Sequence, residues 1–502
     1  MMQGFVLTHQ AGLDLATRPV RLSASGMRDI RRQATRHGQL ESITVAAMAA
    51  TTSANVWLCG QITNEHAIRR LLAERGHVDD GRSGWLHHLY REYGYHGFAL
   101  LEGLFAGALL DDGALVLFAS KTPGPTLYYS IDAVSRTVWA STELKALPLA
   151  RRTLLPLTDI LARDASCQRH ATCLADVWRV SAGYCVQIDL ADVPSASEQP
   201  YYSVLRTVNI LDEATAASRI YATLSQVIQR LPGQHAHCLV SGGLDSSIVA
   251  SLAQAHFTRL DLFTLGSTAR NEFDKADALG RALGLPVTRL LIDESQFLHS
   301  LPEVIALVEH GFSTFIEYLI PVHLAHKQIS SRADIMLSGY GSDVLFAGFA
   351  KAGHDTRTVA ELVSSEYAST AWSNEASQCL GAAMGMEIGY PFFDSEVVDL
   401  AFAIDPYLKH KNGVEKYILR QAFHGKINAE VLWRPKVGIH EGTGCEDYFT
   451  GQLSERGADR TRLLKDALCH AVLREILEQD REPADIDMVA LRQAVLAGVM
   501  PR

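Results

Sequence analysis

One short stretch limits the fold of this chain more than any other feature, Val240-Ser241-Gly242-Gly243-Leu244-Asp245-Ser246-Ser247. An apolar, strand-like run at 236–240 leads into this stretch, and a helix-like run at 247–256 follows it. A glycine-containing turn between a strand and a helix directs backbone N–H groups toward an anion at the helix N-terminus. The sequence therefore predicts a phosphate-binding loop in an α/β domain.

The residue types in this loop indicate which phosphate chemistry it supports. Ser241, Ser246 and Ser247 add hydroxyl donors, whereas Asp245 would repel a phosphate unless a Mg²⁺ ion bridged the two. A Walker P-loop ends in Gly-Lys-Ser/Thr, and this stretch does not. The alternative to a phosphate-binding role is a purely structural one, in which the loop is a glycine turn whose serine and aspartate cap the following helix.

Composition argues against several classes of protein. The chain has 502 residues, 47% of them hydrophobic and 20% charged, which is typical of a globular enzyme with two or more domains. A net charge of −10 argues against a nucleic-acid partner, and no apolar run is long enough to predict a membrane span. The N-terminus lacks the pattern of a signal peptide. The eight cysteines have no metal-ligand spacing, which predicts reduced thiols in a cytoplasmic protein.

Two patterns of secondary structure divide the chain, and we expect domains at 1–205 and 206–502. Short alternating runs separated by turns predict a layered, mostly antiparallel α+β first domain. Its expected helix is 66–75, and its expected strands are 45–47, 56–58, 98–101, 105–110, 115–119, 126–129, 138–140 and 184–188.

The second domain alternates strands with helices, which predicts a parallel sheet with its ligand site at the carboxyl ends of the strands. Its expected strands are 236–240, 260–265, 287–292 and 335–337, and its expected helices are 214–230, 247–256, 273–283 and a stretch from 295. After residue 359 the chain is expected to be almost entirely helical.

Motifs in both halves resemble those of the asparagine synthetase superfamily. Segments 101–106, 124–129 and 140–147 are similar to stretches of its glutaminase-like domain, and the loops at 240–247 and 338–343 are similar to two motifs of its synthetase domain. The resemblance implies an Ntn-hydrolase-like first domain and a second domain of the ATP-pyrophosphatase (adenine nucleotide α-hydrolase-like) fold. It also implies ATP and Mg²⁺ as cofactors, with ATP split between its α- and β-phosphates.

Two positions depart from the glutamine-hydrolysing members of that superfamily. Those members use an N-terminal cysteine as nucleophile and its amine as base, whereas this chain has Met2 and an internal Cys59. We therefore expect a first domain that serves as a scaffold without glutaminase activity. Tyr340 stands where asparagine synthetases carry glutamate. A tyrosine at this position resembles the β-lactam synthetase and carbapenam synthetase branch, and a tabtoxin-type β-lactam synthetase is one possibility within it.

That branch pairs the tyrosine with a downstream glutamate and uses a lysine from an Arg-Pro-Lys-x-Gly-x-His-Glu-Gly loop. The same loop occurs at 434–442, so the resemblance assigns the lysine role to Lys436. Glu375 is the best match for the glutamate, in preference to Glu361, Glu366 and Glu387.

The resemblance implies that a small β-amino acid-type substrate is adenylated and then closes on its own amine. Tyr340 and Glu375 would take the amine's proton, and Lys436 would stabilise the oxyanion. The residues expected to bind the nucleotide are Val240, Ser241, Gly243, Asp245, Ser246, Ser247, Leu265, Gly266 and Gly339. Asp245 and Asp343 are expected to bind Mg²⁺, and Glu317 and Tyr318 are candidates for substrate contact.

Three other interpretations stay open at this point. The chain could be an asparagine synthetase-like enzyme that uses free ammonia, a lasso-peptide macrolactam synthetase, or an inactive binding scaffold. Tyr340 argues against the first, segment 439–442 against the second, and the intact Asp245, Asp343 and Lys436 against the third. The sequence identifies neither the substrate nor the oligomeric state, with a homo-oligomer as one option.

Overall fold

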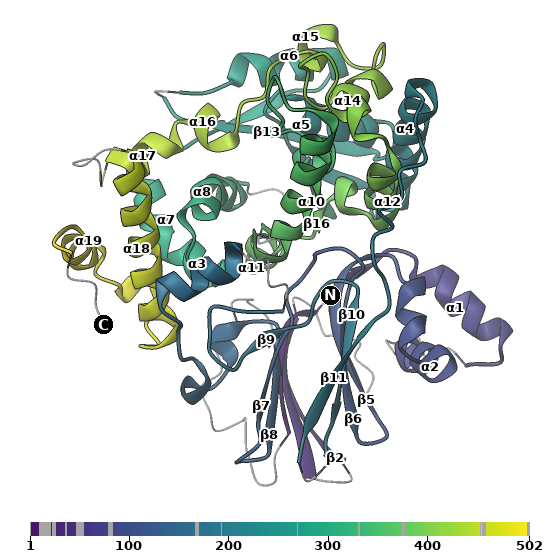
Figure 1. The fold of residues 1–502 in the computed structure, drawn as a ribbon, viewed down its shortest axis with the longest axis vertical. Coiled ribbons are helices and arrows are strands. Elements are labelled where there is room, and N and C mark those ends of the chain that lie inside the picture. The colour runs from purple at the N-terminus through teal and green to yellow at the C-terminus, as the bar shows by residue number, and fades with distance from the viewer. Residues whose placement is uncertain are drawn as a thin grey trace.

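The computed structural model describes residues 2–9, 22, 27–35, 38–46, 55–78, 84–165, 170–191, 193–268, 270–329, 332–373, 377–451, 453 and 458–498. The N-terminal part is built on two stacked sheets, and the C-terminal part is a sheet surrounded by helices (Figure 1). The prediction of a layered α+β domain followed by an α/β domain with a helical C-terminal part is confirmed.

The two sheets of the first domain are antiparallel throughout. One has the strand order β2-β3-β1-β8-β7-β9, and the other has the order β11-β10-β6-β5-β4. These strands are β1 Met2–His9, β2 Met27–Thr35, β3 Gly38–Ala46, β4 Val56–Ile62, β5 Gly103–Asp111, β6 Ala114–Ala119, β7 Tyr128–Asp132, β8 Thr137–Ser141, β9 Trp178–Arg179, β10 Tyr184–Asp189 and β11 Ser195–Pro200.

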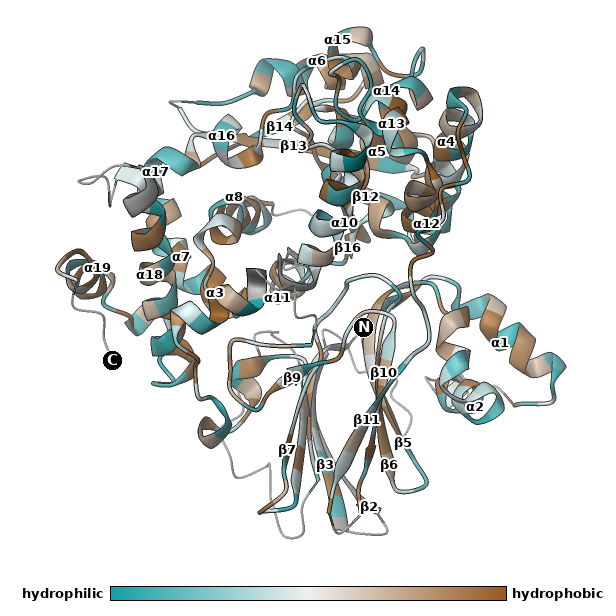
Figure 2. Cartoon of the chain, viewed as in Figure 1, coloured by the Kyte–Doolittle hydropathy of each residue, from teal (hydrophilic) through white to brown (hydrophobic). Residues whose placement is uncertain are grey.

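Alternating side chains fill the space between the two sheets, because successive residues of a strand face opposite sides. Phe5 and Leu7 of β1 pack in one cluster with Val186 and Ile188 of β10. On the outer face of the second sheet, helices α1 (Glu65–Glu74) and α2 (Gly84–Tyr93) cover Phe105 and neighbouring side chains. Figure 2 shows hydrophobic colouring along strands of both sheets.

One predicted strand of the first domain is wrong. Residues 98–101 end a 3₁₀ helix, η2 (Gly94–Leu100), and only Leu101 is extended. Phe98 and Leu101 are both buried under α1 and α2, so the short apolar run reflects burial and not strand pairing. Strands β1, β2, β9 and β11 were not predicted, and the other expected strands of this domain overlap observed ones.

The second domain is organised by a parallel sheet with the order β14-β13-β12-β15-β16. Its strands are β12 His235–Leu239, β13 Arg259–Gly266, β14 Val287–Leu291, β15 Ile335–Leu337 and the unpredicted β16 Ile388–Gly389. The chain runs outward from β12 to β13 and β14, and then returns to the other side of β12 as β15. Such a reversal leaves a crevice at the carboxyl ends of β12 and β15, where ligands bind in sheets of this kind.

Helices surround this sheet and make up most of the chain after residue 359, as predicted. They are α4 Glu213–Arg230, α5 Leu244–Gln254, α6 Phe273–Leu283, α7 Glu294–Val308, α8 Ser313–Gln328, α9 Ser342–Leu345, α10 Thr356–Ser373, α11 Ser377–Ala383, α12 Ser395–Ala403, α13 Pro406–Lys409, α14 Tyr417–Ala422, α15 Ala429–Leu432, α16 Ile439–Thr443, α17 Cys445–Gly451, α18 Ala458–Leu477 and α19 Met488–Leu496. Among the described residues no single helix is long and apolar enough for a membrane span, although the sharply bent pair α7–α8 passes that test of length and composition.

The two halves share a hydrophobic core and several polar contacts. Tyr128, Trp139 and Leu144 of the first domain belong to the same buried cluster as Phe312 and Ile316 near the start of α8. The helix α3 (Leu157–Ala165) adds Ile160 to that cluster. The domain boundary at 205/206 stays a prediction; it falls between the end of β11 and the start of α4.

Candidate functional site

The loop after β12 has the geometry of an anion cradle. Gly242 has a φ of +67°, and a Cβ there would lie 2.4 Å from the carbonyl carbon of Lys275, so only glycine fits without strain. Gly243 N–H donates to Ser241 Oγ at 3.2 Å, and Ser241 N–H donates to Ser246 Oγ at 3.2 Å. Gly243 is the N-cap of α5, so the N–H groups of the first helical turn face the loop.

The loop after β15 lies directly against this cradle. A Cβ on Gly339 would come within 2.9 Å of the backbone of Asp245 and Ser246, which explains the glycine at this position. Ser342 Oγ donates to Asp245 Oδ1 at 2.6 Å and links the two loops. The second predicted motif therefore meets the first at the crevice that the strand order predicts.

Lys416 lies between the two carboxylates that were predicted to hold Mg²⁺. Its Nζ is 2.6 Å from Asp245 Oδ2 and 2.7 Å from Asp343 Oδ1, and its side chain is 3% exposed. Burial would lower the pKa of Lys416, but the two carboxylates raise it above its ordinary value, so the amine is charged at neutral pH. Lys416 was not among the residues predicted from the sequence.

The two carboxylates differ in their electrostatic surroundings. Burial raises the pKa of Asp245, Lys416 offsets part of that increase, and Asp343 adds to it. Burial would also raise the pKa of Asp343, but the ammonium groups of Lys416 and Lys436 bring it below its ordinary value. Asp343 is therefore the more firmly ionised of the two.

The pair of carboxylates fits a hard cation. Asp245 and Asp343 both line the cavity, and their side chains are 23% and 27% exposed. Ionised carboxylates offer about four acceptor positions each, so the bonds to Lys416 and Ser342 leave others for Mg²⁺. Asp245 and Asp343 would hold the ion, whose charge would offset that of a triphosphate.

Lys436 reaches the same site from the loop between α15 and α16. Its Nζ is 3.0 Å from Asp343 Oδ1 and 3.7 Å from the centre of the Phe349 ring. The neighbouring Arg434 pairs with Glu272 and donates from Nη1 to the carbonyl of Ser241 at 3.4 Å. These contacts fix the 434–438 segment over the phosphate loop.

Tyr340 lies on the wall of the cavity. Its ring stacks on Phe393 with 5.4 Å between centres and meets the edge of Tyr390 at 6.2 Å. Glu375, its predicted partner, lies outside the described residues. Glu366 interacts electrostatically with both Lys436 and Asp343, and burial raises its pKa. Sequence analysis had set Glu366 aside.

Most of the predicted site residues line one cavity, which has a volume of about 1530 Å³ including open solvent. The predicted residues that line it are Val240, Ser241, Gly243, Asp245, Ser246, Leu265, Tyr318, Gly339, Tyr340, Asp343 and Lys436.

Three predicted site residues do not line that cavity. Ser247 is fully buried on α5, so its hydroxyl is not exposed to a ligand there. Gly266 ends β13 and accepts a hydrogen bond from Ile292 N–H. Glu317 does not line the cavity and forms an ion pair with Lys465, so its contact with a substrate stays a prediction. Glu387, considered as an alternative base, lines a different cavity between the domains, where burial raises its pKa to about 7.

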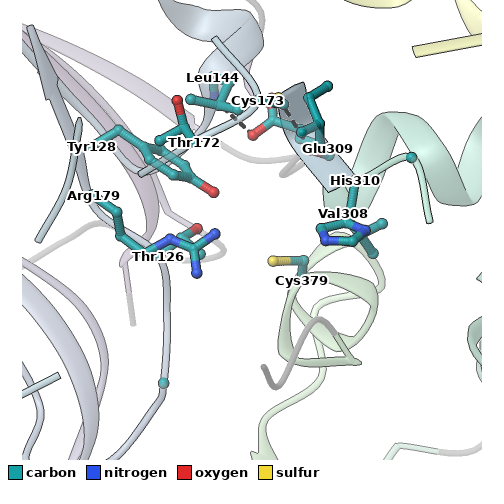
Figure 3. A pocket seen from close by; sticks show the side chains of 13 residues that line it. Thr126, Tyr128, Leu144, Thr172, Cys173, Arg179, Val308, Glu309, His310 and Cys379 are labelled. Carbon is teal, nitrogen blue, oxygen red and sulfur yellow. Dashed lines mark hydrogen bonds between the residues drawn. The ribbon is translucent and has the colours of Figure 1, made fainter. Parts of the chain in front are cut away.

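A second small cavity lies between the domains (Figure 3). Tyr128 and Arg179 lie on one side of it, and His310 and Cys379 lie on the other. The buried carboxylate of Glu309 accepts the N–H groups of Leu144 and Lys145 at 2.6 Å and joins the two halves.

The cysteines of this second cavity lack the properties of nucleophiles. Burial raises the pKa of the Cys173 thiol and of the Cys379 thiol to about 12, so both are protonated at neutral pH. Cys59 is also buried, and burial raises its pKa further above the ordinary range.

Both halves of the chain match models of known protein families. An asparagine synthase family model matches residues 233–379 and 365–491, and a glutamine amidotransferase domain model matches 46–148. The chain is 29% identical over 435 residues to a carboxyethyl-arginine beta-lactam-synthase of Streptomyces clavuligerus, covering 86% of this chain and 82% of that protein. It is 25% identical over 412 residues to a glutamine-hydrolysing asparagine synthetase of Triphysaria versicolor, covering 77% of this chain.

The chain spans 65% of the length of that asparagine synthetase. Among solved structures, NMN synthetase from Francisella tularensis matches 55% of this chain and 97% of that chain, with 15% identity. The TM-score is 0.25, which is a low structural similarity.

The contact between Lys436 and Phe349 generates the first prediction. A cation over an aromatic face is worth about 0.5–2 kcal/mol, so Phe349→Leu should lower the rate of ATP consumption about two- to thirtyfold. Phe349→Trp keeps an aromatic face and should stay near the wild-type rate. Both variants are compared in an assay for ATP consumption, and equal rates for Phe349→Leu and wild type would show that the ring does not position Lys436.

Proposed function

The chain belongs to the asparagine synthase family and is an ATP-dependent enzyme that forms carbon–nitrogen bonds; we propose that it closes an amide ring within one small molecule. The observation that carries the proposal is the presence of Tyr340 and Lys436 in one cavity with the phosphate loop and Asp343. The relative named as a carboxyethyl-arginine beta-lactam-synthase supports a β-amino acid-type substrate and a β-lactam product.

In the first step the substrate carboxylate attacks the α-phosphate of ATP, which yields an acyl-adenylate and pyrophosphate. The N–H groups at the start of α5 and the hydroxyls of Ser241 and Ser246 would bind the departing pyrophosphate. Leu265, at the end of β13, lines the cavity where an adenine ring would pack. Lys436 would neutralise charge that develops on the phosphate oxygens.

In the second step the substrate's own amine attacks the acyl carbon, and AMP leaves. The Tyr340 phenol oxygen takes the amine's proton as its own proton passes to Glu375, and Lys436 stabilises the oxyanion on the acyl carbon. Holding amine and acyl carbon in one molecule removes an entropic barrier of up to about 7–11 kcal/mol for well-aligned groups. No ammonia is needed, which agrees with Met2 at the position where glutamine-hydrolysing members carry the nucleophilic cysteine.

The identity of the products tests adenylation. Phosphorus NMR of a turnover mixture, with a panel of β-amino acids as substrates, should show AMP and pyrophosphate, and ADP would contradict the mechanism. Asp245→Asn and Asp343→Asn should each lower Mg²⁺-dependent ATP–pyrophosphate exchange by at least about 100-fold, because each removes a charge from the proposed ion site. Asp277→Asn, which breaks a surface ion pair with Arg289, is the matched control and should exchange normally.

Separate assays of the two half-reactions test the base. Tyr340→Phe and Glu375→Gln should slow ring closure by about 10²–10⁴-fold while ATP–pyrophosphate exchange largely survives, because proton transfer follows adenylation. The double variant should be little worse than either single one. Glu366→Gln is the comparison variant, because the Glu366 carboxylate also interacts electrostatically with Lys436. If Glu366→Gln stops ring closure and Glu375→Gln does not, the proposed dyad is wrong.

Glutamine tests the role of the first domain. The pure protein should release no glutamate from glutamine, because Met2 has no nucleophilic group and the described thiols near the domain interface are protonated. Product formation should be unchanged by added glutamine or ammonium salts. A glutamine-hydrolysing asparagine synthetase assayed in parallel is the positive control. Glutamate release above background, or formation of asparagine from aspartate and ammonium, would overturn this part of the proposal.

A further inference from the structure

Two histidines and an aspartate gather on one face of the parallel sheet, at the amino ends of its strands. His235 and His237 are alternate residues of β12, so their side chains share a face. The parallel register sets His237 opposite Asp261 of β13 and His235 opposite Arg259. The nucleotide cavity lies at the other, carboxyl ends of the same strands.

The distances in this cluster suit a metal ion. His235 Nε2 is 2.8 Å and His237 Nε2 is 3.6 Å from the same oxygen, Asp261 Oδ2, and one ligand atom from each residue lies within 4.8 Å of the others. Zn²⁺ with ligands at about 2.0–2.1 Å in tetrahedral geometry sets neighbouring ligand atoms about 3.3 Å apart. The two observed distances fall on either side of that value, so the partly exposed side chains of His235 and Asp261 would rotate to complete the geometry.

The donor types select among metal ions. Two imidazole nitrogens and a carboxylate suit Zn²⁺, Co²⁺ or Ni²⁺, whereas Mg²⁺ prefers oxygen ligands in octahedral geometry. His237 is 1% exposed and its ring packs edge-on against Phe263 at 5.0 Å, so its direction is fixed by packing. His235 and Asp261 are 18% and 27% exposed, which leaves the cluster open to solvent on one side.

Arg259 competes for the same carboxylate. Its Nη2 is 2.8 Å from Asp261 Oδ2 and its Nε is 3.2 Å from Asp261 Oδ1. The Arg259 side chain is 61% exposed, so it can turn into solvent without disturbing the core. An ion-pair cluster without metal would make the same contacts, and removal of Arg259 separates the two explanations.

We propose that His235, His237 and Asp261 form a binding site for Zn²⁺ or a similar divalent transition-metal ion, with water completing the coordination. The ion would clamp β12 to β13, the two strands whose far ends carry Ser241 and Leu265 of the nucleotide cavity. A ligand that binds only the folded state raises its stability, so the metal would stiffen this strand pair. The site is independent of the function proposed above.

The test uses the full chain without a histidine tag, freed of metals with a chelator. Zn²⁺ is titrated in competition with a chromophoric chelator, and the absorption of added Co²⁺ reports a tetrahedral site. We expect one equivalent of Zn²⁺ and a higher melting temperature with metal. His235→Ala and Asp261→Asn should weaken binding by at least about tenfold, since even partners of ligands contribute 10–100-fold. His424→Ala, on an exposed residue elsewhere, should leave the affinity unchanged.

Arg259→Gln is the discriminating variant. Loss of an exposed competing cation should tighten Zn²⁺ binding by up to about fivefold, and it should not abolish the tetrahedral Co²⁺ spectrum. No saturable binding by the wild type, or wild-type affinity in His235→Ala and Asp261→Asn, would overturn the proposal. An excess of Mg²⁺ that displaces Zn²⁺ would overturn it as well. ATP–pyrophosphate exchange is measured in the same variants, so that metal binding and the proposed ligase activity are judged independently.

Discussion

The ammonium group of Lys416 holds the candidate site together. It lies 2.6 Å from Asp245 and 2.7 Å from Asp343, and without it two partly buried carboxylates from neighbouring loops would repel each other. Lys416 lies at the N-terminus of α14 and has a φ of +54°, a left-handed backbone conformation that residues other than glycine rarely adopt. The ion pairs offset that strain and join three segments that are far apart in the sequence.

The proposed adenylation of a carboxylate would depend on this arrangement. The strand order opens a crevice between the loops after β12 and β15, and Lys416 keeps Asp343 ionised there together with Lys436. Glycines at positions 242 and 339 let the backbone approach closely enough for N–H groups to reach phosphate. The first domain shares a core with the helices behind the site, which is consistent with a scaffold.

Local signals predicted the phosphate loop, the 338–343 motif and most strands, because each carries its own glycine, serine or alternation pattern. Lys416 could not be predicted, since it is separated from Asp245 by 171 positions and belongs to no recognised motif. The ion pair of Glu317 with Lys465 could not be predicted either, because a glutamate on a helix gives no sequence signal for a partner 148 positions away. Ser247 shares the loop's sequence signal, but helix periodicity turns it into the core. Strand β16 is too short to show alternation.

Transfer of oxygen isotope from substrate to nucleotide tests the central claim most directly. A β-amino acid found active in the substrate panel is labelled with ¹⁸O in its carboxylate and converted with unlabelled ATP. If the carboxylate attacks the α-phosphate, one ¹⁸O atom must appear in AMP and none in pyrophosphate, and mass spectrometry of the separated products measures both. Label in pyrophosphate or inorganic phosphate, or unlabelled AMP beside a closed ring, would contradict the acyl-adenylate and with it the role assigned to the two loops.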